Sequence, residues 1–131
     1  MLKLLLIFLG AGAGGLARYW IGGAVQNAWG PGLPVGTMLV NVTGCLLIGF
    51  LAAAFEGPLL IREEFRIGIL IGVLGGYTTF STFGRETLAL LHDRQWTLAI
   101  TNVVLSNVLG VLAAWIGWMT ARATLGGGNG A

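Results

Sequence analysis

The chain has 131 residues, of which 56% are apolar and only 9% are charged, whereas about a quarter of the residues in a soluble domain are charged. This composition excludes an ordinary water-soluble enzyme, and a net charge of +2 is too small to indicate nucleic acid as a partner. Four stretches contain no Asp, Glu, Lys or Arg: residues 4–17, 19–55, 67–84 and 95–121. Lipid is therefore the expected surrounding of most of the chain.

These stretches predict four membrane-spanning helices, because one span needs about 20 mostly apolar residues. The longest stretch must hold two spans, and the segment GPGLP at residues 30–34 divides it. We expect the spans near residues 4–25, 35–55, 65–91 and 96–121. The predicted fold class is an all-α, multi-pass protein of the cell (inner or plasma) membrane, with residues 1–125 as a single domain and residues 126–131 as a Gly-rich disordered tail.

The chain start and the single cysteine carry little functional information. Residues 1–13 superficially resemble a signal peptide, but the apolar run before Gly10 is short and the hydrophobicity continues to Ile21. Cys45 lies in the second predicted span, where we expect a small buried residue without an intrachain disulfide partner.

The basic residues give only a weak bias for membrane orientation. One side holds four of them and the other holds two, with a further one, Arg18, inside the first span: Lys3, Arg62, Arg66 and Arg122 against Arg85 and Arg94. A chain with so small a bias can insert both ways, and two opposite copies can then pair antiparallel. A single orientation with the N-terminus inside is the alternative.

Small residues at spacings of four predict close helix packing in lipid. The third span offers Gly68, Gly72 and Gly76, and the first offers Gly10 and Gly14. Four helices do not easily seal themselves and also enclose a polar path. We therefore expect at least a dimer, with the third span near its centre.

The segment GGYTT at residues 75–79 is the most informative part of the chain. Its residues are poor helix formers, yet they lie midway along a predicted span, where unpaired backbone groups are costly. Broken helices of transporters use such freed carbonyls to hold cations. The segment therefore predicts an ion site at a helix break, and a helix kinked by glycine and repaired by threonine hydroxyls is the alternative.

Polar and aromatic side chains flank this break at helical spacings. Phe80 and Phe83 share a face, and their positive ring edges could line an anion path, although ordinary packing explains such pairs too. The second and fourth spans each carry a polar stripe, formed by Thr37 with Asn41 and by Asn102 with Ser106. Their amides and hydroxyls can replace the water around an anion, or can simply bond one helix to another.

Charged side chains inside the spans are few. Arg18 is well inside the first span and either faces a cavity or extends to the interface. The acidic residues, Glu86 among them, are expected at or beyond the span ends. His92 is expected to be solvated, and no catalytic or metal-binding motif is present, so we predict that the protein is not an enzyme.

Three segments resemble successive signatures of the Fluc (CrcB) family of fluoride ion channels: GAGGLAR at residues 12–18, GTMLVNVTG at 36–44 and GVLGGYTTFSTF at 72–83. The resemblance implies a fluoride-selective channel for passive efflux, which lowers cytoplasmic fluoride. It also implies four transmembrane helices with a break in the third, a dual-topology antiparallel homodimer with two pores, and a structural Na⁺ at the dimer centre.

The resemblance also implies roles for individual residues. The carbonyls of Gly75 and Thr78 would hold the sodium ion, Phe80 and Phe83 would line the pores, and Asn41 would donate a hydrogen bond to fluoride. Ser106 would be the pore serine, Ser81 and Thr82 would extend the polar track, and Arg18 would lie in an aqueous vestibule. The family often has tyrosine one turn before that serine, where this chain has Asn102.

Two other functions fit parts of the pattern. A proton-coupled exporter of lipophilic cations, resembling the small multidrug resistance transporters, would have a similar size but needs a carboxylate that titrates within the membrane. A non-transporting assembly protein would explain the glycine faces but not the break at residues 75–79.

Overall fold

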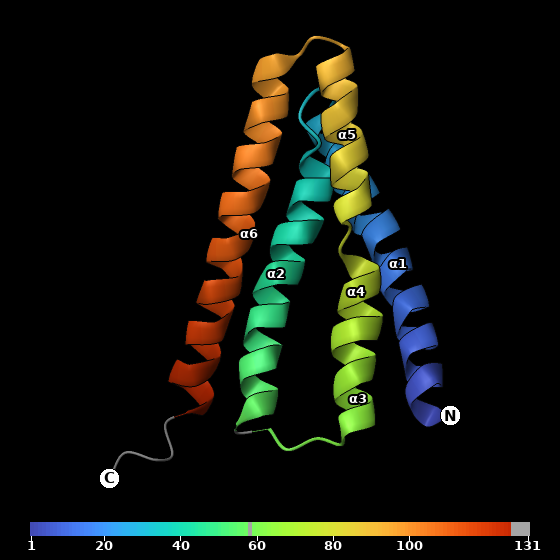
Figure 1. The fold of residues 1–131 in the computed structure, drawn as a ribbon, viewed down its shortest axis with the longest axis vertical. Coiled ribbons are helices and arrows are strands. Elements are labelled where there is room, and N and C mark those ends of the chain that lie inside the picture. Colours follow the sequence, from blue (N-terminus) through green and yellow to red (C-terminus); the bar gives the residue numbers. More distant parts are fainter. Residues whose placement is uncertain (58, 127–131) are drawn as a thin grey trace.

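The computed structural model describes residues 1–57 and 59–126, and these form four helical columns (Figure 1). Three columns are single helices: α1 (Leu2–Trp29), α2 (Val35–Glu56) and α6 (Trp96–Leu125). The third span, Glu63–His92, is assembled from α3 (Glu63–Ile67), η1 (Gly68–Leu74), α4 (Gly75–Tyr77) and α5 (Phe80–His92). Each column is long and apolar enough to cross a bilayer, and no strand occurs in the described part of the chain, which confirms the all-α class.

The loop between α1 and α2 lies where the sequence predicts it. Gly30 and Gly32 have φ values of 96° and 113°, which favour glycine over other residues. The Gln26 side chain fastens this turn, because its Nε2 donates to the Gly30 carbonyl at 2.7 Å and its Oε1 accepts from the Gly36 N–H at 3.0 Å. These hydrogen bonds therefore hold residues 30–34 in a fixed turn between two spans.

Two helices extend beyond their predicted ends, because they continue into polar sequence. The structure extends α1 to Trp29 and α6 to Leu125, four residues beyond each predicted end. Those last turns carry Gln26, Arg122 and Thr124, which a count of apolar residues leaves out although an α-helix accepts them. Gly126 caps α6, and the rest of the predicted tail, residues 127–131, is outside the described residues.

The start of α1, the end of α6, the end of α2 and the start of α3 lie at the same end of the bundle (Figure 1). Ion pairs at this end join Lys3 to Glu63 at 3.1 Å and Arg62 to Glu64 at 3.3 Å. This placement agrees with the predicted four-span topology, in which the N-terminus and the second loop share one side.

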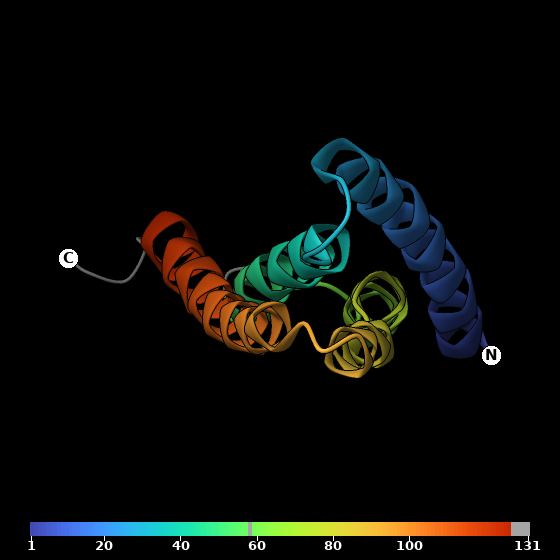
Figure 2. The same cartoon turned by 90° about the horizontal axis from the view of Figure 1, so that it is seen from above.

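Seen from above, α1 and α6 lie at opposite edges of the bundle, with α2 and the third span between them (Figure 2). The most extensive contacts join α1 to the third span and α2 to α6. Large apolar side chains on the outer faces, such as Phe8, Ile100 and Val111, are exposed, as expected for a surface in contact with lipid.

Glycines bring α1 and the third span into backbone contact. A Cβ atom at Gly10 would lie 2.8 Å from the Gly68 carbonyl oxygen, and one at Gly76 would lie 2.8 Å from the Ala11 Cα. Gly14 is equally tight against Val73 and Gly76. The predicted packing faces are therefore confirmed, and they face each other.

The first half of the third span has a conformation that the sequence does not predict. Residues Gly68–Leu74 form π-helical turns rather than α-helical ones. Such turns are rare and are frequently found at functional sites. Here they lie against α1 and lead directly to the residues that form the site.

The packing predicts that Gly14→Ala destabilises the protein by about 1–3 kcal/mol, because the added methyl group meets the Val73 carbonyl and the Tyr77 N–H. The unfolding free energy in detergent micelles measures this effect. Gly12→Ala is the matched control, since nothing lies within 4 Å of a Cβ atom at Gly12. Equal stability of the two variants would contradict the close approach.

Candidate functional site

The site is organised by two residues of extended backbone within the third span. After α4 ends at Tyr77, Thr78 has φ −83° and ψ 157°, and Thr79 has φ −151° and ψ 113°. The helix resumes at Phe80. In a continuous helix the Thr79 N–H would donate to the Gly75 carbonyl, but here it donates to Asn41 Oδ1 at 2.7 Å.

Side chains from two other helices bond the backbone groups of these two residues. Asn41 on α2 also donates from Nδ2 to the Thr79 carbonyl at 3.0 Å. Arg18 on α1 donates from Nη1 to the Thr78 carbonyl at 3.3 Å. Because water is scarce at bilayer depth, such partners are what makes non-helical backbone tolerable there.

Thr79 also prepares the start of α5. Its hydroxyl oxygen accepts from the Thr82 N–H at 3.2 Å, which makes it the N-cap of that helix, and its hydroxyl donates to Thr82 Oγ1 at 3.0 Å. The amino end of α5, which carries a partial positive charge, therefore begins at the interruption.

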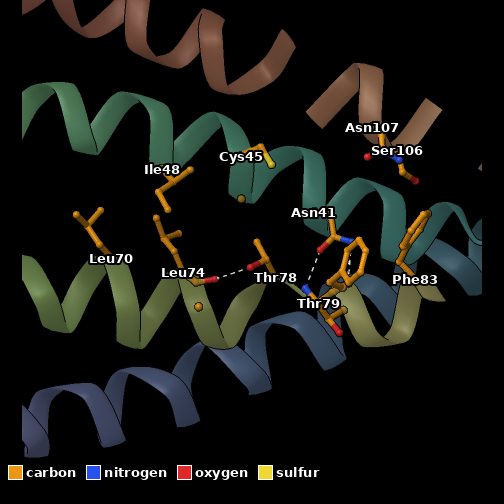
Figure 3. Close-up of a pocket in the computed structure, with 13 residues that line it drawn as sticks. Asn41, Cys45, Ile48, Leu70, Leu74, Thr78, Thr79, Phe83, Ser106 and Asn107 are labelled. Carbon is orange, nitrogen blue, oxygen red and sulfur yellow. Dashed lines mark hydrogen bonds between the residues drawn. The ribbon is translucent and has the colours of Figure 1, made fainter. Parts of the chain in front are cut away.

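A cavity of about 320 Å³ lies on one side of the extended residues (Figure 3). We call it the aromatic cavity, and six of the predicted site residues line it: Asn41, Gly75, Thr78, Phe80, Phe83 and Ser106. The Phe80 and Phe83 rings lie 5.4 Å apart at 40°, and Phe80 is 80% exposed in the single chain. Cys45 is also in the wall, half-buried rather than buried as predicted.

A second cavity, of about 420 Å³, lies between α1, α2 and α5, and we call it the polar chamber. Its lining includes Arg18, Thr37 and Thr82 from the predicted set, together with Thr79 and Glu86. Thr79 lines both cavities, so the extended residues separate the aromatic cavity from the polar chamber.

Two predicted residues line neither of these cavities. Asn102 is only 1% exposed and donates from Nδ2 to Thr87 Oγ1 at 2.9 Å, so it ties α6 to α5. Its Oδ1 accepts from the Ser106 hydroxyl at 3.3 Å. Ser81 is exposed, with its Oγ 3.4 Å from Thr79 Oγ1. Asn102 can thus orient Ser106, and Ser81 lies beside the break.

Glu86 is a site residue that sequence reasoning missed. The prediction placed it at or beyond a span end, but α5 continues to His92 and the Glu86 side chain is half-buried in the polar chamber. Its Oε1 accepts from the Thr37 hydroxyl at 2.9 Å, and its Oε2 is buried without a hydrogen bond from the described residues. The spacing of Thr79, Thr82 and Glu86, at i, i+3 and i+7, could have revealed this shared face.

Comparison with known proteins identifies the family. A profile described as "CrcB-like protein, Camphor Resistance (CrcB)" matches residues 5–118, a range that contains every predicted site residue. The chain belongs to the CrcB family.

Individual relatives cover the same region. The chain is 42% identical over 121 residues to a fluoride-specific ion channel FluC of Solibacter usitatus, with 92% of this chain and 99% of that protein covered. It is 41% identical over 128 residues to the protein of that name from Pelobacter propionicus, with 98% and 99% covered. A Methylococcus capsulatus relative of that name is 43% identical over 121 residues, which are 92% of this chain but 53% of the relative, so the chain spans about half its length.

The site geometry predicts that Asn41→Leu loosens the break, because two backbone groups of Thr79 lose their partners at about 1–3 kcal/mol each. Amide hydrogen exchange at Thr79 should become at least about tenfold faster, since 1.4 kcal/mol corresponds to a factor of ten. Asn107→Leu is the control, because among the described residues the Asn107 side chain bonds to Val103 of its own helix. Unchanged exchange in Asn41→Leu would contradict the clamp.

Proposed function

We propose that this protein is a fluoride-selective channel that lets fluoride leave the cell passively. The observation that carries the proposal is the 42% identity to a relative named as a fluoride-specific ion channel, over nearly the full length of both chains. The two cavities on either side of the extended residues supply a matching path. A channel needs no catalytic step, so the protein acts as a conduit and not as an enzyme.

The polar chamber is suited to attract an anion. It holds the Arg18 guanidinium, of which one N–H is used on the Thr78 carbonyl and the other donors are available. It also faces the amino end of α5, where Thr82 supplies a hydroxyl. Fluoride entering this chamber exchanges part of its water shell for these donors.

The aromatic cavity is suited to pass a small anion without binding it tightly. The positive edges of Phe80 and Phe83 attract negative charge without supplying a full cation. Asn41 keeps one Nδ2 hydrogen free after donating to Thr79, and it can direct that hydrogen toward the ion. Ser106 adds a hydroxyl on the α6 side.

An antiparallel pair of oppositely inserted copies is the proposed functional unit. In a single chain the aromatic cavity opens outward and Phe80 is exposed. A Cβ atom added at Gly75 would have nothing within 4 Å of it. A second copy placed against this face would close the cavity. The weak charge bias between the two membrane sides is compatible with insertion in both directions.

A structural sodium ion at the centre of this pair fits the oxygen atoms present. The Gly75 carbonyl has lost its helical donor because the Thr79 N–H turns to Asn41, and the Thr78 carbonyl follows as extended backbone. Neutral carbonyl oxygens are suitable ligands for a hard monovalent cation at a broken helix. Bound there, sodium would supply the positive charge that joins the two opposed breaks.

The position of Glu86 keeps the proton-coupled exporter as the hypothesis to test against. Such a transporter needs a titratable carboxylate inside the membrane, and the polar chamber contains one. The family relatives favour the channel, because those compared above carry the name of a fluoride-specific ion channel.

An efflux assay on purified protein in liposomes separates the two functions. Liposomes loaded with fluoride should release it when a potassium ionophore balances the charge, and liposomes loaded with chloride should not. No proton gradient should be required. Release of fluoride only under an imposed proton gradient would overturn the channel and support the exporter.

The same assay tests the aromatic cavity. Phe80→Ile and Phe83→Ile should each lower fluoride release while leaving the dimer intact, because isoleucine fills space without a positive ring edge. Phe8→Ile, on the lipid-facing side of α1, is the control and should release fluoride at the wild-type rate. Wild-type rates in both cavity variants would remove the rings from the path.

Dual insertion predicts that a cysteine in the α5–α6 loop reacts from both sides of the membrane. His92 is suitable, since its side chain is 88% exposed, and His92→Cys would be made in a Cys45→Ala background. Impermeant thiol reagents should label about equal fractions in intact cells and in inverted vesicles. Labelling from one side only would show a single orientation.

A further inference from the structure

The Arg18 side chain links the polar chamber to the extended backbone of the third span. Its guanidinium lies in the polar chamber and donates to the Thr78 carbonyl, one of the oxygen atoms proposed to hold sodium. One helical turn earlier, Gly14 is packed against the backbone of Val73 and Gly76. Because α1 is fixed so closely beside the third span, the Arg18 side chain extends from a rigid base.

The shared oxygen places a permanent positive charge next to the cation site. A carbonyl oxygen has two lone pairs, so the guanidinium occupies one and leaves the other for a cation. Repulsion between the two positive charges grows with the charge of the ion, and it is twice as large for a divalent as for a monovalent cation. Arginine stays charged at any physiological pH, so this repulsion is constant.

A divalent ion at the proposed site would find no carboxylate ligand among the described residues that line it. The described residues that line the aromatic cavity, where Gly75 and Thr78 are accessible, include no carboxylate. Glu86 shares the polar chamber with Arg18, but the two side chains form no ion pair, and Glu86 accepts from Thr37 instead. Calcium sites in proteins normally include carboxylate ligands.

We propose that Arg18 is a positioning residue that makes the central site selective for monovalent cations, because it holds the Thr78 carbonyl in place and repels divalent ions by its charge. Sodium and calcium ions are close in size, so charge and not fit discriminates between them here. This inference rests on the sodium site of the proposed function and assigns its selectivity to a residue of α1.

The test compares cation-dependent unfolding of the purified protein in detergent, followed by the fluorescence of its five tryptophans. Sodium chloride should raise the unfolding temperature of the wild-type protein relative to N-methyl-D-glucamine chloride, and calcium chloride at equal ionic strength should not. In Arg18→Gln, the apparent affinity for Ca²⁺ relative to Na⁺ should rise by at least about tenfold. Arg18→Lys should keep the wild-type preference, because the charge remains.

Arg85→Gln is the matched control, since it removes one positive charge from the third span at an exposed residue. It should behave as the wild type. A calcium response of equal size in Arg85→Gln and Arg18→Gln would overturn the proposal in favour of a general net-charge effect. Continued indifference of Arg18→Gln to calcium would also overturn it.

Two further outcomes are decided by the wild-type protein. If Arg18→Gln does not fold, sodium NMR of the wild-type protein supplies the test. Sodium bound to the protein broadens the sodium signal, and this broadening should persist when calcium is added. Loss of the broadening at calcium concentrations comparable to that of sodium would refute the selectivity. If the wild type responds to neither cation, the sodium site itself is wrong and the inference falls with it. Fluoride efflux from liposomes is measured separately, so failure of the sodium-site inference can be distinguished from failure of the channel proposal.

Discussion

The whole arrangement depends on the need to satisfy two peptide groups within a hydrocarbon layer. Thr78 and Thr79 leave the helix where water is scarce, and each lost partner there costs about 1–3 kcal/mol. Asn41 and Arg18 supply the missing partners from α2 and α1. The interruption is therefore a property of three helices together, and it cannot exist in the isolated third span.

The glycine packing of the first span serves this requirement, because it brings α1 close to the extended backbone. A guanidinium reaches the Thr78 carbonyl only because α1 approaches the third span at backbone distance. Larger residues at Gly10 or Gly14 would move the helix axis outward and carry Arg18 with it. A motif that sequence reasoning reads as generic helix packing thus also sets the position of a charged side chain near the middle of the bilayer.

Much of the fold follows from the sequence because lipid imposes simple rules on length and polarity. The four spans, the GPGLP loop and the paired glycine faces were all predictable. The segment GGYTT was expected to leave the helix as a whole, but Gly75–Tyr77 are helical and only Thr78 and Thr79 have extended backbone. The π-helical turns were not, because no local pattern distinguishes them from α-helix. The location of Glu86 was missed because a charge was assigned to a span end, whereas its partner Thr37 comes from another helix.

Most of the predicted site residues line one of two cavities, but the sequence did not predict that there are two. Sequence periodicity places Asn41 with Thr37 and Asn102 with Ser106 on common faces, yet the structure separates Thr37 from Asn41 by assigning them to different cavities. Asn102 turns out to be a buried bond between α5 and α6. Such distinctions depend on helix rotation, which neighbouring helices decide and hydropathy does not.

The wide turns of η1 have a consequence for how the length of the third span can change. A π-helical turn holds one more residue than an α-helical turn. The segment between Ile67 and Gly75 therefore contains more residues than the same number of α-helical turns would need. Loss of a single residue there could be absorbed by tightening the spiral, while everything downstream kept its angular position. The first half of the third span is thus the part of this chain where a length change can occur without displacing the extended backbone at Thr78 and Thr79.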